Sequence, residues 1–105
     1  MAAIAGSWDL KIKTPIGSIS ATYTFAETAD GLTGIATSTD ESVPLADIAT
    51  RITPEGERVT WRQAVTRPIR LNLDFDVTAV GDRLTGHSRA GRLPRSQVSG
   101  RRRPA

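Results

Sequence analysis

The sequence contains no cysteine, one histidine and few aromatic side chains. Two Trp, one Tyr and two Phe occur among 105 residues, and the single imidazole belongs to His87. Without cysteine the chain can form no disulfide, no thiolate nucleophile and no cysteine-based zinc site. One imidazole also excludes a site built from several histidines. We therefore expect a domain stabilised by packing, with no metal and no cofactor.

A long apolar run is also missing. The opening residues MAAIAGSW show neither the basic segment nor the apolar stretch of a signal peptide, and no stretch is long enough to span a bilayer. At 105 residues the chain has the size of one domain, residues 1–105. We expect a cytoplasmic protein that does not associate with membranes.

Positive charge is concentrated at one end of the chain. The net charge is +3, and seven of the fourteen Lys and Arg residues lie at or after Arg83. Residues 101–105 form a basic tail with three consecutive arginines. Such a tail attracts polyanions weakly and in a salt-dependent way. Because no basic stripe is interleaved with aromatic residues, we expect no specific nucleic-acid binding.

Apolar and polar residues alternate through much of the sequence. The alternation is clear in residues 8–13, 18–25 and 70–77, and no window shows a helical period of useful length. Period two is typical of strands with one buried and one solvated face. Turn-forming residues separate the alternating segments. The expected strands are 6–14, 18–27, 31–39, 43–52, 57–66, 69–79, 83–90 and 95–102.

Short connections between these strands favour an up-and-down antiparallel meander. Eight strands can close into a barrel whose interior holds side chains or one small ligand, and closure removes the exposed edges of the sheet. We therefore predict an all-β fold, an eight-stranded antiparallel up-and-down barrel. An open sandwich, with its edges covered in a homodimer, is the alternative.

The two halves of the chain resemble each other. WDLKIKTP at 8–15 matches WRQAVTRP at 61–68, and GLTG at 31–34 matches RLTG at 83–86. The spacing predicts internal repeats at about 6–52 and 57–103, related by a pseudo-two-fold axis. Duplicated halves normally share one backbone course, so positions where the copies differ in chemistry point to function.

Two short motifs stand where expected strands begin, Gly6-Ser7-Trp8 and Asp30-Gly31-Leu32-Thr33-Gly34. The first resembles the Gly-x-Trp that opens the first strand in the calycin group, which includes the lipocalins and the avidin-like proteins. The second is similar to a turn-and-strand segment of streptavidin-like barrels. The resemblance implies a small calycin-like β-barrel in which Arg101, near the last strand, packs across Trp8.

The differences between the halves predict a binding site. With Trp8 and Trp61 pointing inward, most aligned inward pairs are apolar in both copies. Small residues such as Gly34 and Gly86 leave room in the centre, and a buried polar group without a partner costs roughly 1–3 kcal/mol. Four inward pairs carry a polar group in one copy: Gln63 for Leu10, Tyr23 for Phe75, Ser88 for Ala36 and Ser96 for Ala46. A bulge at Pro44 or Pro94 would change the inward positions of the fourth strand in each half, and so the last pair. We predict a cavity that binds an apolar small molecule, lined by Trp8, Tyr23, Phe25, Trp61, Gln63, Phe75, Ser88 and Ser96.

The same pattern fits two other functions. A cofactor-independent isomerase or cyclase would use this cavity, with Tyr23 and Gln63 polarising a carbonyl, but the interior offers no clear base and we assign no catalytic residue. A structural or interaction protein would have a filled barrel with Trp8 and Trp61 as core anchors. We expect His87, Asp74 and Asp76 to lie on the solvated outer face.

Overall fold

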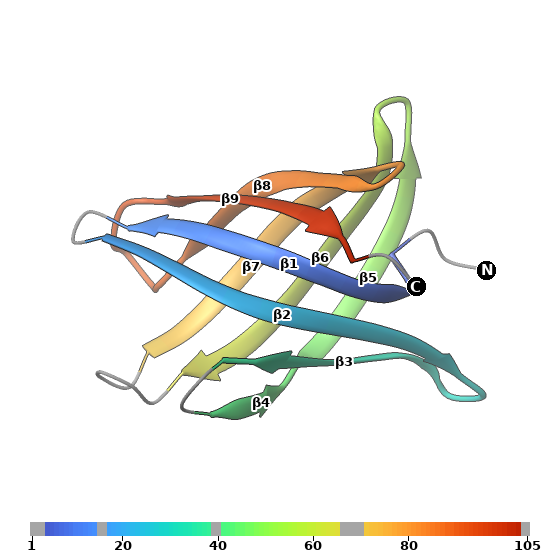
Figure 1. Ribbon diagram of the computed structural model, residues 1–105, viewed down its shortest axis with the longest axis horizontal. Coiled ribbons are helices and arrows are strands. Elements are labelled where there is room, and N and C mark those ends of the chain that lie inside the picture. Colours follow the sequence, from blue (N-terminus) through green and yellow to red (C-terminus); the bar gives the residue numbers. More distant parts are fainter. Residues whose placement is uncertain (1–3, 15–16, 39–40, 66–70, 104–105) are drawn as a thin grey trace.

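The computed structural model describes residues 4–14, 17–38, 41–65 and 71–103, which form nine strands in one antiparallel sheet (Figure 1). The strand order is β4-β3-β2-β1-β9-β8-β7-β6-β5, and the sheet curls into a nearly closed barrel. These residues contain no helix, and so none of membrane-spanning length. The strands are β1 (Gly6–Thr14), β2 (Gly17–Thr28), β3 (Gly31–Thr37), β4 (Ser42–Pro44), β5 (Ala46–Thr53), β6 (Gly56–Val65), β7 (Leu71–Val80), β8 (Arg83–Arg89) and β9 (Ser96–Arg102).

The all-β, antiparallel prediction is confirmed, but the strand count of eight is wrong. The expected strand 43–52 is divided into β4 and β5, with Leu45 between them. Pro44 is the last residue of β4. Asp47 follows with a φ of 55°, and the β5–β6 register shifts just after Ala46. This bulge turns the chain, so that Ala46, which the alternation placed inside, is exposed.

The inner face of the barrel forms the hydrophobic core. On β1 the alternation is confirmed, because Trp8, Leu10 and Ile12 are buried and the charged residues between them are exposed. The buried apolar side chains come from seven of the strands and from the segment before β1. They are Ile4, Trp8, Leu10, Ile12, Tyr23, Phe25, Ala36, Val59, Trp61, Phe75, Val77, Ala79, Leu84 and Val98.

The segment before β1 closes one end of the barrel. Ile4 is fully buried, its N–H donates to Glu57 Oε1 over 2.9 Å, and its carbonyl accepts from Trp8 Nε1 over 2.9 Å. The Arg102 guanidinium lies over the Trp8 ring, 4.4 Å from the centroid, and donates to the Ala5 carbonyl over 2.6 Å. The buried polar groups at this end thus satisfy one another.

The arginine that packs across the opening Trp is therefore Arg102, and the expectation of Arg101 is wrong. β9 pairs with β1 so that Arg102 lies opposite Trp8 and Arg101 opposite Asp9. Neighbouring residues of a strand point to opposite faces, which leaves Arg101 exposed on the outer face. The one-residue difference follows from the register of β9, which the sequence motif did not specify.

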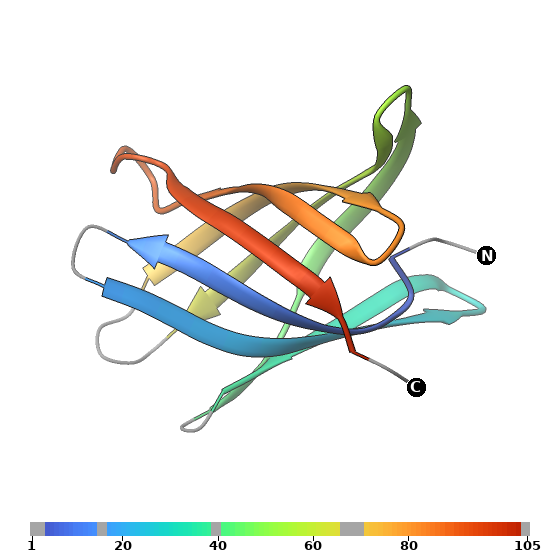
Figure 2. The ribbon, with the colours of Figure 1, turned by 45° about the horizontal axis from the view of Figure 1, so that its top comes forward.

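The barrel wall is not closed by a ladder between β3 and β5. β4 and β5 are the two ends of the sheet, and along their described lengths β3 and β5 make contact without strand pairing (Figures 1 and 2). One backbone hydrogen bond crosses this boundary, from the Leu45 N–H to the Gly34 carbonyl over 2.9 Å. We call the boundary the seam; it runs along residues 31–34 of β3 and 46–53 of β5.

Candidate functional site

Four aromatic side chains from three strands meet inside the barrel. Trp61 of β6 stacks on Phe75 of β7, with ring centroids 4.8 Å apart and an 8° angle between the planes. Phe25 of β2 meets the Trp61 ring edge-on at 5.3 Å, and Tyr23 lies 5.7 Å from the same ring. β2 and β6 stand on opposite sides of the seam. This aromatic cluster (Tyr23, Phe25, Trp61 and Phe75) therefore joins the two sides through side-chain contact.

A buried polar group is shared within the cluster. Oε1 of Gln63 accepts from the Tyr23 hydroxyl over 2.8 Å and from Trp61 Nε1 over 3.0 Å. Gln63 is only 6 % exposed, so both hydrogen bonds are shielded from water. Burial raises the pKa of Tyr23 above its ordinary value, partly offset by the hydrogen bond to Gln63. Tyr23 is thus a neutral hydrogen-bond donor at physiological pH.

The predicted site residues are brought into one region, with one exception. Ser88 is buried and lies opposite Phe75, and Ser96 is half-buried and lies opposite Ser88. Trp8 neighbours Tyr23 in the β1–β2 ladder, but its indole N–H is bonded to Ile4 and its face is covered by Arg102. Trp8 thus belongs to the core at the closed end, and ligand binding by all eight predicted residues stays a prediction.

The small residues do not leave the room that the sequence suggested. A Cβ at Gly34 would lie 2.7 Å from Leu45 Cδ1 and 3.2 Å from Phe25 Cδ2. A Cβ at Gly86 would meet the Asp76 carbonyl oxygen and lie 2.5 Å from Val77 Cα. Neighbouring atoms already fill both spaces. At these positions glycine permits close packing of the barrel, and the expectation of a hollow beside them is wrong.

A surface groove follows the seam. Its volume is about 270 Å³, and its residues come from the β2–β3 hairpin on one side and β5 on the other. Leu32 and Ile48 in this groove pack against the buried core. The remaining lining residues are Glu27, Thr28, Gly31 and Thr50. Sequence reasoning missed this groove because it assumed full closure of the barrel by strand pairing.

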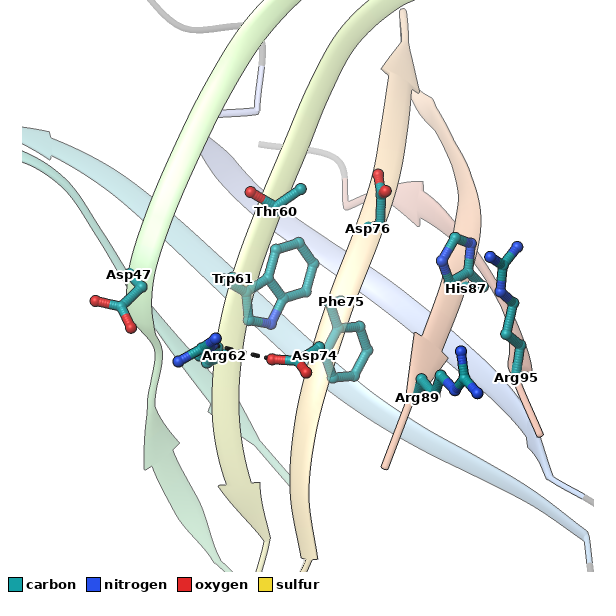
Figure 3. Close-up of a pocket in the computed structure, with 10 residues that line it drawn as sticks. All are labelled: Asp47, Thr60, Trp61, Arg62, Asp74, Phe75, Asp76, His87, Arg89 and Arg95. Atoms are coloured by element: carbon teal, nitrogen blue, oxygen red, sulfur yellow. Dashed lines mark ion pairs between the residues drawn. The ribbon is translucent and has the colours of Figure 1, made fainter. Parts of the chain in front are cut away.

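A second groove lies on the outer face of β6, β7 and β8 (Figure 3). Its volume is about 320 Å³. The expectation that His87, Asp74 and Asp76 face outward is confirmed, since all three line this groove and none points into the core. The alternation predicted only that they lie on the surface, whereas the structure brings them into one groove with Arg62, Arg89 and Arg95.

Comparisons with known proteins add no relative. A scan against family models, a search of curated proteins and a search of solved structures each find no match for this chain. The function must therefore be argued from the geometry of these two grooves and the cluster behind the seam.

Proposed function

We propose that the barrel binds an apolar small molecule at the seam. The observation that carries this proposal is the missing ladder between β3 and β5, where a groove of about 270 Å³ has Leu32 and Ile48 packed on the core. Everywhere else in the described wall, neighbouring strands are hydrogen-bonded through their backbones. The seam is the place where side chains can separate without breaking strand pairs.

Side-chain contacts close the barrel behind the seam. The Tyr23–Gln63 hydrogen bond and the Phe25–Trp61 ring contact both run from β2 to β6. An apolar molecule that inserts there would exchange these contacts for its own, and would meet rings on both sides. A ligand group that accepts a hydrogen bond could take the place of Gln63 Oε1 at the Tyr23 hydroxyl.

The energetic cost of this exchange is modest. One neutral hydrogen bond contributes about 0.5–1.5 kcal/mol, and one aromatic pair contributes about as much beyond its burial. Burial of roughly 100 Å² of apolar ligand surface contributes about 2.5 kcal/mol, at about 25 cal/mol per Å². A small apolar molecule can therefore offset the contacts that it replaces.

Binding is favoured over catalysis by the position of the buried carboxylate. Among the described residues the buried acid is Glu57, which accepts from the Ile4 N–H at the closed end of the barrel. An isomerase or cyclase acting beside Tyr23 would need a base within reach of its substrate. We therefore keep the isomerase as the second candidate and the filled, purely structural barrel as the third.

We also propose that the barrel is calycin-like and that its halves are duplicated. The contact of Arg102 with Trp8 at the Gly6-Ser7-Trp8 start supports the first idea. The strand pairing supports the second, because the last strand of each half pairs with the first strand of the other, as β5 with β6 and β9 with β1.

Uptake of the neutral apolar dye Nile red by the folded protein tests the function. We expect saturable binding that Leu32→Asp weakens at least about tenfold, since a charge would then face the apolar part of the groove. Val80→Asp is the matched control because Val80 is 57 % exposed and does not line the groove, and we expect no change. Absence of dye uptake, or equal effects of both variants, would reject binding at the seam.

Tyr23→Phe separates the binding protein from the isomerase. Loss of one hydrogen bond changes ligand affinity by no more than about tenfold. In an enzyme the same change would reduce turnover much further, because the hydroxyl would stabilise charge that develops in the transition state.

A further inference from the structure

The outer groove is lined by charged side chains of both signs. Its walls come from β5 to β8 and from the segment before β9 (Figure 3). The lining charged or titratable residues are Asp47, Arg62, Asp74, Asp76, His87, Arg89 and Arg95. Trp61 and Phe75 of the aromatic cluster also line this groove, together with Thr60. No residue lines both this groove and the groove at the seam, so the two grooves can be occupied separately.

The arginines of β6 neutralise two of the carboxylates. Arg62 Nε lies 3.1 Å from Asp74 Oδ1, and Arg58 Nε donates to Asp76 Oδ1 over 2.9 Å. The hydrogen bonds from Arg58 are the main reason why the pKa of Asp76 lies below its ordinary value; partial burial opposes this effect, and electrostatic interactions with Arg58, His87 and Arg95 add to it. Asp76 is therefore ionised at neutral pH, and both carboxylates already have an arginine partner.

The arginines on the β8 side differ from those of β6. Among the residues that the structure describes, neither Arg89 nor Arg95 forms an ion pair. Arg89 Nε donates to the Leu93 carbonyl over 3.0 Å, which holds the guanidinium and leaves its terminal N–H groups for another acceptor. Figure 3 shows Arg89 and Arg95 beside His87 at one end of the groove. Side-chain N–H groups that can donate to a ligand thus lie together at this end of the groove.

We propose that His87, Arg89 and Arg95 bind the oxyanion of a small molecule, a phosphate or a carboxylate. Guanidinium groups match the spacing of such oxygens and donate two parallel hydrogen bonds to them. The imidazole of His87, two residues before Arg89 on β8, supplies a third donor. Asp74 and Asp76 lie opposite Arg89 and His87 in the β7–β8 ladder, and their carboxylates can accept hydrogen bonds from hydroxyl groups attached to the anion. The site thus suits a hydroxylated anion such as a sugar phosphate or a hydroxycarboxylate.

The arrangement favours a compact ligand over a polyanion. The groove volume of about 320 Å³ is within the usual range for small-molecule sites. An extended nucleic acid would reach beyond His87, Arg89 and Arg95 to the rest of the groove. Its phosphates would there lie close to Asp47, Asp74 and Asp76. Like charges that face each other at close range oppose binding.

Heteronuclear NMR titration of the isotope-labelled protein tests this site. The probes are inorganic phosphate, glucose 6-phosphate and citrate, with sodium chloride as the ionic-strength control. We expect saturable shifts of the His87, Arg89 and Arg95 amides with at least one probe. Tighter binding of glucose 6-phosphate or of citrate than of inorganic phosphate would identify the source of the anion and support a role for the acidic side chains.

Matched variants make the result specific. Arg89→Gln and Arg95→Gln should each weaken binding at least about tenfold, the typical loss for a charge-assisted hydrogen bond. Arg101→Gln removes the same charge from an exposed position of β9 outside the groove and should have no effect. Equal effects of all three variants, or shifts reproduced by chloride alone, would overturn the proposal. Nile red binding should be unchanged in these variants. The proposal of binding at the seam and the proposal of an anion site can therefore be rejected separately.

Discussion

The Tyr23 hydroxyl donates to the Gln63 side-chain carbonyl across the seam of the barrel, over a distance of 2.8 Å. The two residues are 40 positions apart in the chain and belong to β2 and β6. Each breaks the apolar pattern of its strand, and each is the partner that the other requires. β3 and β5 form no ladder at the seam. This buried hydrogen bond therefore helps to hold the two sides of the barrel together, as backbone hydrogen bonds do between the other strands.

Burial of Tyr23 predicts a loss of stability in alkaline solution. Its pKa is raised above the ordinary value of 10.0, so the unfolded chain loses the phenolic proton first. Below about pH 10 this residue leaves the free energy of unfolding independent of pH, and above it that free energy falls. In Tyr23→Phe the free energy of unfolding should not show this decrease above pH 10, but at neutral pH it should be about 1 kcal/mol lower than in the wild type.

The measurement compares urea unfolding of the two proteins between neutral and alkaline pH. Tyr23 is the only tyrosine, so tyrosinate absorbance reports its titration directly. Titration of the folded protein near the ordinary pKa would contradict the burial of this hydroxyl.

Arg102 should contribute to stability and its neighbour should not. Arg102→Ala removes a guanidinium stacked on Trp8 and a hydrogen bond to the Ala5 carbonyl, so we expect a loss of about 1–3 kcal/mol. Arg101→Ala removes an exposed side chain and should change the free energy of unfolding by less than about 0.5 kcal/mol. Chemical denaturation checks both values, and equal losses would show that the register of β9 is different.

Two glycines should respond differently to a methyl group. Gly86→Ala places a Cβ against the Asp76 carbonyl and 2.5 Å from Val77 Cα, where only backbone movement can relieve the clash. We expect a loss of about 1–3 kcal/mol. At Gly34 the nearest atom is the end of the Leu45 side chain, which can rotate, so Gly34→Ala should cost less. Thermal unfolding measures this order, and a reversed order would contradict the described packing.

The bulge at the start of β5 should prefer glycine. Asp47 has a φ of 55°, a conformation that costs an ordinary L-residue roughly 1–2 kcal/mol. Asp47→Gly should therefore preserve or raise the free energy of unfolding, whereas Asp47→Val should lower it by about that amount. Equal stability of the two variants would mean that residue 47 does not hold this conformation in solution.

Much of the barrel could be predicted from the alternation of residues. The expected bounds of most strands agree with the structure within two residues, and the inward positions of Trp8, Tyr23, Trp61 and Gln63 are confirmed. Pro44 indicated a bulge in the strand 43–52, but the division of that strand at Leu45 was not predicted, because it depends on the unusual φ of Asp47 rather than on any pattern of polarity. A bulge is a local backbone choice that period two does not reveal.

The candidate sites were harder to predict than the strands. Tyr23 and Gln63 were expected to face a ligand, but the sequence could not show that they would face each other, because that depends on how β2 and β6 approach across the seam. The outer groove depends on the registers of neighbouring strands, which bring Asp76 opposite His87 and Asp74 opposite Arg89. In the linear sequence these residues read as ordinary solvated positions.

The sequence by itself determined that this chain is an antiparallel β-protein, which face of most strands turns inward, and that no cysteine chemistry is available to it. Those properties follow from residue type and from the two-residue period of a strand, and both are local. Only the tertiary structure decided that β3 and β5 would meet without a ladder, that Arg102 would cover Trp8, and that Arg89 and Arg95 would lie beside His87 without an ion pair to any described residue. These features depend on register and curvature, which are set when distant strands pack together and which no single segment encodes.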